Sequence, residues 1–531
     1  MSAHSDRFVH NNLPPPELWP HLIFDLPELQ FPAQYNASSV LDAAIATGLG
    51  GNNAVLSGSA KLSYADLLEQ ANRVANVLTG DMALVPGNRV LIHAPNSAMT
   101  IAIWWGVLRA GGVAVATVPM LRAGELAAII EKARISHALI DAGLAAEFEL
   151  ARRGNPTLHQ VLYCGEGGEL ETRLRSAPRA FAPVATAADD PALIAFTSGT
   201  TGSPKGCVHF HRDVAAMATT FSRHILRPKP SDVFCGTPPF AFTFGLGASV
   251  VFPAVCGAAT ALPERPGFEV LADAIAQHKA TTLFTSPTGY RALLKLGAER
   301  LASLHTCVSA GEHLPKATSD QWHEATGIRI IDGIGSTEMI HIFVSAHGDD
   351  IRPGATGKAV PGYIAGLLDE NDVLIEGAGV GRLAVRGPTG CRYLADERQR
   401  SYVIDGWNVT GDIYRRDEDG YFWFVSRADD MIISSGYNIA AAEVESALLT
   451  HAYVAEAAVV GVADEERGQI VKAFVVLTSS APIDQAAIQA LQDHVKQTIA
   501  PYKYPRAIEF VSELPKTLTG KLQRFRLRER P

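Results

Sequence analysis

Apolar strand-like runs alternate with helical patterns through the first two thirds of the chain, and this repeat constrains the fold more than any other feature. Residues 89–94 and 113–117 are apolar enough to be strands buried on both faces, and helical patterns over 99–109 and 123–132 follow them. The other strands that we expect here are 138–140, 281–285, 305–308 and 328–331. A strand–helix–strand repeat of this kind builds parallel sheets with helices on their faces.

The pattern changes in the last third of the chain. From 360 to 428 the apolar runs become shorter and turn residues separate them, which favours an antiparallel subdomain. An α+β pattern begins near 430, with helices over 443–449 and 488–499 and strands over 457–462, 471–477 and 505–511. We therefore expect a large α/β N-terminal domain over 1–428 and a small α+β C-terminal domain over 429–531.

Composition excludes several classes of protein. The chain has 531 residues, of which 47% are apolar, so it is globular and not disordered. Its formal charge of −9 gives no basic field for nucleic acid or for an acidic membrane surface. The uncharged stretch 233–263 is broken by prolines and glycines, which favours buried core over a membrane span. Six unpaired cysteines and a polar N-terminus without a signal peptide predict a cytoplasmic location.

A loop rich in glycine and hydroxyl residues directly follows the apolar strand 192–195. Its backbone N–H groups and hydroxyls can surround an anion, and a lysine adds a positive charge. The loop residues concerned are Thr197, Ser198, Gly199, Thr200, Thr201, Gly202 and Lys205. This chemistry suits a polyphosphate, although the order of residues is not that of a Walker loop. The alternative is a flexible polar turn at the surface.

Together with this loop, five further motifs occur in one order along the chain. They are 309–312 (SAGE), 332–338 (DGIGSTE), 406–412 (GWNVTGD), 426–432 (SRADDMI) and 515–521 (PKTLTGK). The set resembles the adenylate-forming superfamily of acyl-CoA synthetases, luciferases and peptide-synthetase adenylation domains, over nearly the whole chain. The resemblance implies a large N-terminal domain and a mobile small C-terminal domain, with ATP, Mg²⁺ and coenzyme A as the small molecules used.

The resemblance also implies catalytic roles. The family joins a carboxylate to the α-phosphorus of ATP, and cations lower the repulsion between the two anions. Lys205 would contact the phosphates, and Lys521 would bridge carboxylate and phosphate. Glu338, with Thr337, would lie beside the Mg²⁺. Asp429 matches the family's hinge, about which the small domain rotates, and Gly436 would line the passage for the pantetheine thiol.

Further positions match the family's nucleotide site. Asp412 would accept hydrogen bonds from both ribose hydroxyls, and Arg427 would reach the ribose or a phosphate. Gly311, Asp332 and Gly333 would surround the adenine. The remaining nucleotide-binding positions that the resemblance implies are Glu312, Ile334, Gly335, Ser336 and Phe424.

The segment 239–247 matches the acyl pocket of the family. Phe242 falls at its mouth, and Thr243 replaces the aspartate with which amino-acid-activating domains pair an ammonium group, so amino acids are disfavoured. The motifs at 332–343 and 387–394 resemble aryl-CoA ligases, those for 2-aminobenzoate and benzoate above all. Thr243 and Phe244 stand where benzoate enzymes are expected to have Ala-Tyr, which favours 2-aminobenzoate. The other predicted pocket residues are Ala310, Gly335, His341, Ile342 and His347.

Other assignments stay open at this point. Benzoate, or another substituted benzoate, is an alternative substrate, and a carrier protein is an alternative acceptor to coenzyme A. A non-catalytic adenylate-binding module is disfavoured because Lys205, Glu338 and Lys521 are all present. A homodimer is neither required nor excluded. The pairs His209/His211 and Glu338/His341 have no third ligand at the usual spacing, so we predict no transition-metal site there.

Overall fold

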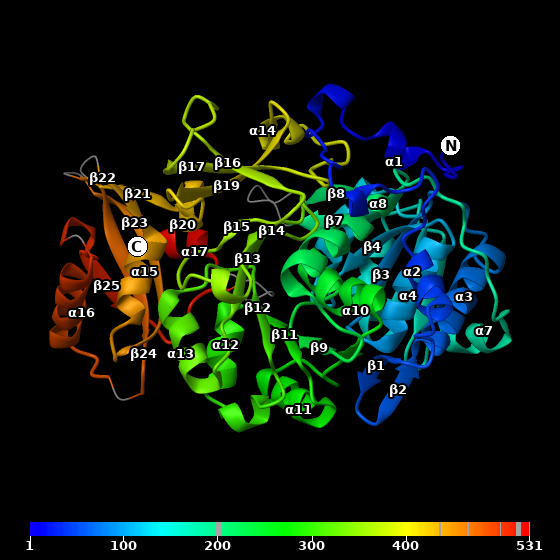
Figure 1. Cartoon of the computed structure of the whole chain (residues 1–531), viewed down its shortest axis with the longest axis horizontal. Coiled ribbons are helices and arrows are strands. Elements are labelled where there is room, and N and C mark those ends of the chain that lie inside the picture. The colour runs from blue at the N-terminus through cyan, green and yellow to red at the C-terminus, as the bar shows by residue number, and fades with distance from the viewer. Residues whose placement is uncertain are drawn as a thin grey trace.

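The computed structural model has a large body built on three β-sheets and a smaller body at one end that carries a fourth (Figure 1). The residues that the structure describes are 1–197, 204–434, 437–464, 467–479, 481–499, 501–516 and 522–529. Among them, no helix is both long enough and apolar enough to cross a membrane.

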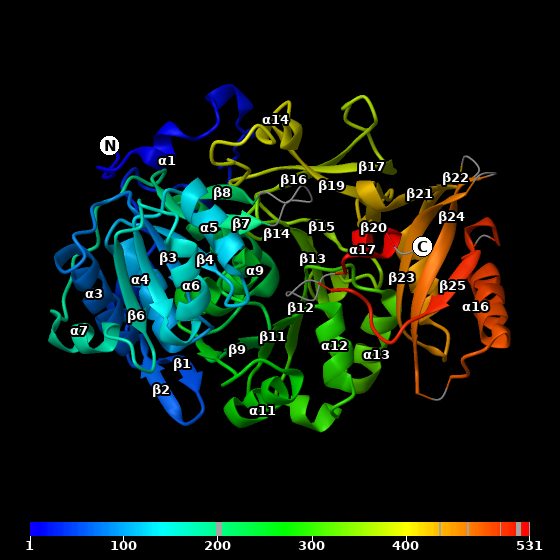
Figure 2. The ribbon, with the colours of Figure 1, turned by 180° about the vertical axis from the view of Figure 1, so that it is seen from behind.

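The first sheet has the strand order β6-β5-β3-β4-β7-β8, in which only the β7–β8 pair is antiparallel. Alternate residues of β3 point to opposite faces, so Val90 and Ile92 join the core beneath α3 and α4, whereas Leu91 joins the core beneath α5 and α6. Helices therefore cover both faces, and α5 and α6 are seen in front in Figure 2. The bounds are β3 Arg89–His93, β4 Val113–Thr117, β5 His137–Asp141, β6 Gln160–Cys164, β7 Pro191–Thr197, β8 Lys205–Phe210, α3 Tyr64–Gly80, α4 Ala98–Arg109, α5 Ala123–Lys132, α6 Ala145–Arg152 and α7 Leu170–Ser176.

The second sheet has nine strands in the order β15-β14-β13-β12-β11-β9-β10-β1-β2. Its central strands are parallel, and the antiparallel hairpin β13–β14 lies near one edge. The strands are β1 Asn53–Ser57, β2 Ala60–Ser63, β9 Val233–Gly236, β10 Ala259–Ala261, β11 Thr282–Thr285, β12 Thr306–Ser309, β13 Ile331–Gly335, β14 Ile342–Ser345 and β15 Lys358–Ala359. The helical segments of this region are α2 Ser39–Ala46, α8 His211–Met217, η4 Ala218–Leu226, α9 Thr243–Leu246, η5 Gly247–Val251, α10 Phe252–Cys256, α11 Phe268–His278, α12 Pro287–Leu294, η6 Ala298–Leu301, α13 Lys316–Thr326 and η7 Gly348–Asp350.

The third sheet is antiparallel. Its residues lie in the sequence between the last strand of the second sheet and the first strand of the small body. It consists of β16 Ile364–Leu368, β17 Gly379–Arg386, β18 Val403–Ile404, β19 Trp407–Arg416 and β20 Phe422–Arg427, with α14 at Gln399–Tyr402. The 3₁₀ turn η8, Ala428–Asp430, follows β20 directly and leads into the small body.

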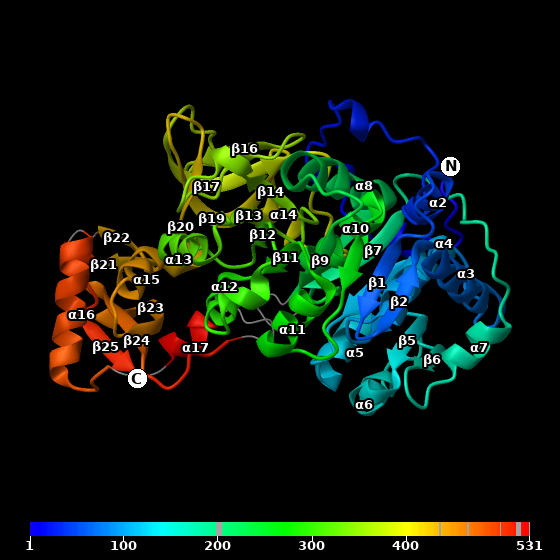
Figure 3. The same ribbon diagram turned by 60° about the horizontal axis from the view of Figure 1, so that its bottom comes forward.

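The small body is one sheet with helices on both faces (Figure 3). Apolar residues of α15 and α16 share a core with one face, and Leu527 of α17 packs with Ala458, Val460 and Phe474 on the other. The elements are β21 Met431–Ser434, β22 Tyr437–Ala440, α15 Ala441–Leu449, β23 Val454–Asp464, β24 Gly468–Leu477, α16 Gln485–Thr498, η9 Pro501–Lys503, β25 Ala507–Phe510 and α17 Arg524–Arg528.

The N-terminal segment runs along the outside of the large body and ties two sheets together. The backbone N–H of His21 donates to the carbonyl of Gly406, and that of Ile23 donates to Gly387, both in the antiparallel part. The segment contains α1 Phe8–Asn11, η1 Pro16–Leu18 and η2 Pro27–Leu29. In Figure 1 it begins beside the first sheet and crosses to the antiparallel sheet.

The predicted fold class is confirmed, and most predicted elements lie where the sequence pattern placed them. One strand prediction is wrong: 328–331 is mostly the connection after α13, and β13 runs over Ile331–Gly335. Gly327 ends α13 in a left-handed conformation, with φ +73°, and the chain pairs with β12 and β14 only from Ile331 onward. The two glycines of β13 make its own β-propensity too low to be recognised.

Candidate functional site

A lysine, a tyrosine and a glutamate from three separate segments form the centre of the candidate site. Lys205 opens β8 and its Nζ donates to the hydroxyl of Tyr393 at 3.1 Å. The Tyr393 hydroxyl donates in turn to Oε1 of Glu338 at 2.5 Å. Burial and the charge of Glu338 raise the pKa of Tyr393 far above its usual range, so the phenol stays a donor. Two predicted catalytic residues are thus linked by a residue to which sequence reasoning gave no role.

A second layer of buried polar residues holds the backbone beside Glu338. The ring Nε2 of His209 lies 2.7 Å from the carbonyl oxygen of Thr337, and its Nδ1 lies 3.6 Å from Asp213, which pairs with Arg392 at 2.9 Å. Burial alone would lower the pKa of His209, but Cys207 and Asp213 beside it raise that pKa above its usual range. Because a carbonyl oxygen only accepts, Nε2 of His209 carries a proton and donates it to Thr337.

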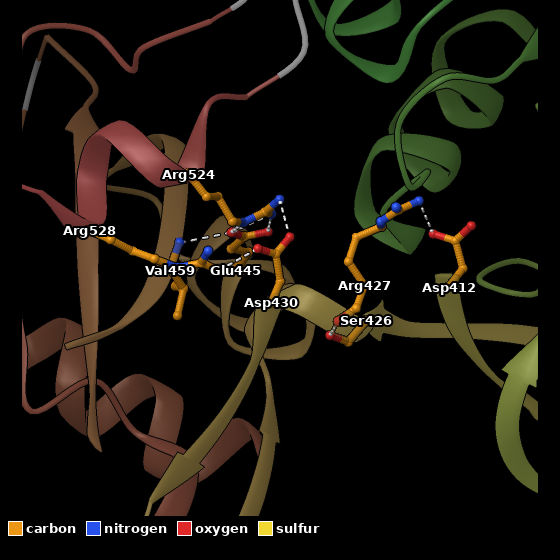
Figure 4. A network of polar contacts seen from close by, with 8 residues as sticks. All are labelled: Asp412, Ser426, Arg427, Asp430, Glu445, Val459, Arg524 and Arg528. Carbon is orange, nitrogen blue, oxygen red and sulfur yellow. Dashed lines mark hydrogen bonds and ion pairs between the residues drawn. The ribbon is translucent and has the colours of Figure 1, made fainter. Parts of the chain in front are cut away.

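The predicted ribose residues lie on neighbouring strands of the antiparallel sheet. Asp412 of β19 and Arg427 of β20 are register partners, and Nη1 of Arg427 donates to Oδ1 of Asp412 at 2.9 Å (Figure 4). Asp412 is only 8% exposed. Phe424 lies on the same strand as Arg427, and its ring stacks on the ring of His313 with centroids 5.0 Å apart.

The predicted adenine residues lie at the ends of β12 and β13. Gly311 has φ +89°, and no atom lies within 4 Å of the position that a Cβ would take there, so this left-handed turn leaves open space beside it. Glu312 accepts from the hydroxyl of Thr288 at 3.0 Å. Burial raises the pKa of Asp332 to about 8, and a carboxyl group that keeps its proton both donates and accepts hydrogen bonds.

The other positions of this stretch lie in β13 or directly after it. Ser336 Oγ lies 3.3 Å from the hydroxyl of Tyr402 and accepts from the backbone N–H of Met339 at 3.2 Å. Gly333 and Gly335 lie where an added side chain would collide with Ile342 or with the backbone of His341. Ile334 is half-buried and packs on the main core. The close packing of β13 on β14 therefore requires both glycines.

Aromatic rings surround His341 in the predicted acyl pocket. The centroid of its ring lies 5.1 Å from that of Phe221, 5.8 Å from Phe244 and 4.7 Å from Phe252. Burial lowers the pKa of His341 to about 3, so the imidazole is neutral. Both of its ring nitrogens are buried and have no hydrogen-bond partner among the described residues. The surroundings of the His341 imidazole are therefore aromatic and apolar.

The remaining predicted pocket residues lie on three segments. Phe242 precedes α9 in an extended conformation, and Thr243, only 6% exposed, is the first residue of that helix. The Thr243 hydroxyl makes no hydrogen bond within the described part of the chain. Ala310 is buried after β12, and Ile342 is buried in β14. His347 lies beyond β14, where Arg227 and Asp350 act on it, and no ring contact joins it to His341 in the described structure.

Two ion-pair groups lie on either side of the predicted hinge (Figure 4). On one side Arg427 pairs with Asp412 of the antiparallel sheet. On the other, Asp430 pairs with Arg524 at 3.3 Å and with Arg528 at 2.5 Å, both from α17 of the small body. Only two residues, Ala428 and Asp429, separate these groups.

Several predicted residues lie outside the described part of the chain. They are Ser198, Gly199, Thr200, Thr201 and Gly202 of the phosphate loop, Gly436, and Lys521. Thr197, which precedes the loop at the end of β7, has a buried hydroxyl without a partner among the described residues. The roles of all these residues stay predictions.

These residues suit a reaction that brings two anions together, a carboxylate and a polyphosphate. Lys205 offers a positive charge, Glu338 offers a carboxylate for a cation, and Asp412 offers a carboxylate of the kind that binds a diol. The aromatic rings around His341 come from η4, α9 and α10.

Comparison with known proteins agrees with this arrangement. The chain matches the AMP-binding enzyme family over residues 43–393 and the C-terminal domain of AMP-binding enzymes over 443–521. It is 35% identical to a benzoate–CoA ligase of Thauera aromatica, over 94% of this chain and 97% of that protein. It is 34% identical to a 4-hydroxybenzoate–CoA/benzoate–CoA ligase of Rhodopseudomonas palustris, over 93% and 94%.

Solved structures give the same result. A crystal structure of an anthranilate CoA ligase in complex with anthranoyl-AMP superposes with a TM-score of 0.90 at 33% identity, over 95% of this chain and 98% of that one. A benzoate CoA ligase from Burkholderia xenovorans LB400 gives a TM-score of 0.86 at 31% identity, over 93% and 100%. The chain therefore belongs to the AMP-binding enzyme family, as an AMP-forming acid–CoA ligase that uses ATP, Mg²⁺ and coenzyme A.

Proposed function

We propose that the acid is 2-aminobenzoate, which the enzyme converts to its adenylate and then transfers to coenzyme A, releasing pyrophosphate and AMP. An aryl substrate is supported by the names of the relatives, which act on benzoate, 4-hydroxybenzoate or anthranilate. Benzoate is the competing substrate, because two curated relatives and one solved structure carry its name.

The choice of 2-aminobenzoate over benzoate rests on two polar side chains of the predicted acyl pocket. The Thr243 hydroxyl and the neutral ring of His341 have no hydrogen-bond partner among the described residues, and both side chains are buried. An aniline amine is neutral at pH 7, so it needs hydrogen-bond acceptors and not a carboxylate. A hydroxyl and an imidazole nitrogen supply them, whereas an unsubstituted ring would leave both unpaired.

The direct test is acid-dependent ATP–pyrophosphate exchange with a panel of aryl acids before any thiol is added. We expect 2-aminobenzoate to give a higher kcat/KM than benzoate, and coenzyme A to be the acceptor in the second step. A carrier protein offered in competition with coenzyme A checks the acceptor. If benzoate is the better substrate, the assignment of the ring substituent is wrong although the enzyme class stands.

Replacing Thr243 by alanine tests the hydroxyl itself. One net hydrogen bond contributes about 0.5–1.5 kcal/mol, so Thr243→Ala should lower kcat/KM for 2-aminobenzoate about 2- to 12-fold and leave benzoate nearly unchanged. Thr243→Ser is the matched control, because it removes the same methyl group and keeps the hydroxyl. An equal fall for both acids would mean that Thr243 only packs, and a much larger preference in the wild type would point to His341.

The residues around Glu338 fit a magnesium ion. Oε1 of Glu338 accepts from Tyr393, and Oε2 has no partner in the described structure, so one hard oxygen is available. Magnesium held there, with Thr337 nearby, would supply charge neutralisation for the triphosphate. Lys205 would add a second positive charge, Asp412 would orient the ribose, and the turn at Gly311 would admit the base.

We further propose that the chain divides at 428/429 and that the small domain rotates about Asp429. Asp429→Pro fixes φ near −65°, so thioester formation from a supplied aryl-adenylate should fall more than pyrophosphate exchange. Ala428→Pro is the comparison: Arg427 before it is already extended (φ −77°, ψ 147°), as a residue before proline must be, so it fixes only the φ of Ala428 and leaves the torsions of Asp429 free. A smaller loss of thioester formation in Ala428→Pro than in Asp429→Pro would place the rotation at Asp429. Normal thioester formation by Asp429→Pro would place the hinge elsewhere.

A further inference from the structure

Two histidines of the N-terminal segment meet a buried aspartate on the first sheet. His4 precedes α1, His10 lies within it, and Asp190 lies in the turn that leads into β7. One ligand atom of each residue lies within 4.8 Å of the other two. Asp190 is fully buried, His4 is 5% exposed and His10 is half-buried. Asp190 is 180 positions from His10, so spacing in the sequence gave no signal.

The hydrogen bonds around Asp190 leave one of its oxygens directed at the histidines. Oδ2 accepts from the backbone N–H groups of Ala3 and Ala187, both at 2.9 Å, which fixes the carboxylate. Oδ1 lies 3.2 Å from Nε2 of His10, a separation that suits either a hydrogen bond or two ligands of one ion. Ser2 Oγ, at 3.4 Å from the same nitrogen, is the other polar contact of His10.

His4 has the features of a metal ligand, and its ring makes no hydrogen bond in the described structure. Both of its ring nitrogens are buried and unpartnered in the described structure, and its ring lies edge-on to His10 with centroids 5.4 Å apart. Because an imidazole buried without partners costs stability, such a group calls for an explanation.

A neighbouring histidine, His211, also has a buried ring nitrogen without a partner among the described residues. Nδ1 of His211 accepts from the backbone N–H of Ala37 at 3.1 Å, so a neutral His211 carries its proton on Nε2. That Nε2 is also buried without a partner among the described residues. The backbone N–H of His211 donates to the carbonyl of Asp190 at 3.1 Å, which places this histidine beside the cluster. Its N–H can donate to a water bound there.

We propose that His4, His10 and Asp190 bind a divalent transition-metal ion, Zn²⁺ above all, with water as a fourth ligand. Neutral imidazoles and a carboxylate are the ligands that such ions prefer, and three protein ligands with one water make a common coordination set. The site is separate from Glu338, whose oxygen donors suit Mg²⁺. A metal here would fasten the start of the chain to the first sheet.

The test uses the full-length protein, freed of metal with a chelator and then titrated with Co²⁺ in excess Mg²⁺. We expect one equivalent to bind with the visible absorption of a four-coordinate Co²⁺ site, and Zn²⁺ to displace it. His4→Phe, which keeps a ring of similar shape, and His10→Gln, which can still bond Asp190, should each weaken binding by more than the roughly 10- to 100-fold that second-layer changes cause. His323→Gln, at an exposed histidine of α13, is the matched control and should bind normally.

Thermal unfolding supplies an independent readout. Zn²⁺ should raise the midpoint of the wild type and of His323→Gln but not of His4→Phe, whereas pyrophosphate exchange should be the same in all folded variants. Absence of stoichiometric Co²⁺ binding to the wild type would overturn the proposal and leave a His10–Asp190 hydrogen bond beside a buried water. Equal binding by His4→Phe and the wild type would overturn it as well.

Discussion

Replacing Lys521 by alanine is expected to abolish pyrophosphate exchange while thioester formation from a supplied aryl-adenylate continues. A lysine that bridges the carboxylate and the α-phosphate stabilises charge in the first step only, so we expect that step to fall at least about 10³-fold. The two half-reactions are measured separately, the first by exchange and the second by release of AMP in the presence of coenzyme A.

The described residues that flank Lys521 in the sequence belong to the small body. The described residues on either side of it are fixed there: Gln523 donates its backbone N–H to Pro515 at 2.8 Å, and Lys516 forms a β-bridge with Leu522. Lys516→Ala is a matched control, because it removes a lysine from the same segment whose partner is Glu456 at 2.5 Å. We expect both half-reactions to survive in that control. Equal loss of both in Lys521→Ala would contradict the assigned role.

Replacing Glu338 by glutamine is the second large effect that we expect. The amide keeps the shape of the side chain and can still accept from Tyr393, but it loses the charge that would hold Mg²⁺. Pyrophosphate exchange should fall about 10²- to 10³-fold, equivalent to about 3–4 kcal/mol of transition-state stabilisation. The half-saturating Mg²⁺ concentration, measured at fixed ATP, should rise.

Tyr393→Phe distinguishes the contribution of the Mg²⁺ ion from that of the hydrogen bond between Tyr393 and Glu338. This variant keeps the Glu338 carboxylate and removes only the hydroxyl that joins it to Lys205, so exchange should fall about tenfold with an unchanged Mg²⁺ requirement. If Glu338→Gln shows the wild-type dependence on Mg²⁺, Glu338 does not hold the ion, whatever its effect on rate.

The elements that the sequence predicted well are those with one dominant signal. The strands β3 and β4 are buried along almost their whole length, so their short apolar runs identified them. The strand β13 was misplaced because its glycines allow close packing on β14 at the expense of β-propensity. The π-helical turns of η4 and η5 were not predicted, since no residue pattern distinguishes them from α-helix.

The candidate site was predictable where a motif supplied both partners and not where a contact crosses the chain. Glu338 and Lys205 came from motifs, but Tyr393, which joins them, is 188 positions from Lys205. His209 was considered only as a metal ligand, and its bond to the Thr337 carbonyl spans 128 positions. Contacts of this kind depend on which strands become neighbours, and that information lies in the topology of the sheets.

The two ion-pair groups around the proposed hinge have a consequence for the rotation that we propose for the small domain. Arg427 is held by the antiparallel sheet and Asp430 by α17, so a change of orientation that keeps both pairs must be absorbed by Ala428 and Asp429. Each of these residues has only a few sterically allowed combinations of φ and ψ. The number of accessible orientations is therefore small, and a fluorescence distance measurement across the hinge should resolve separate populations instead of one broad distribution.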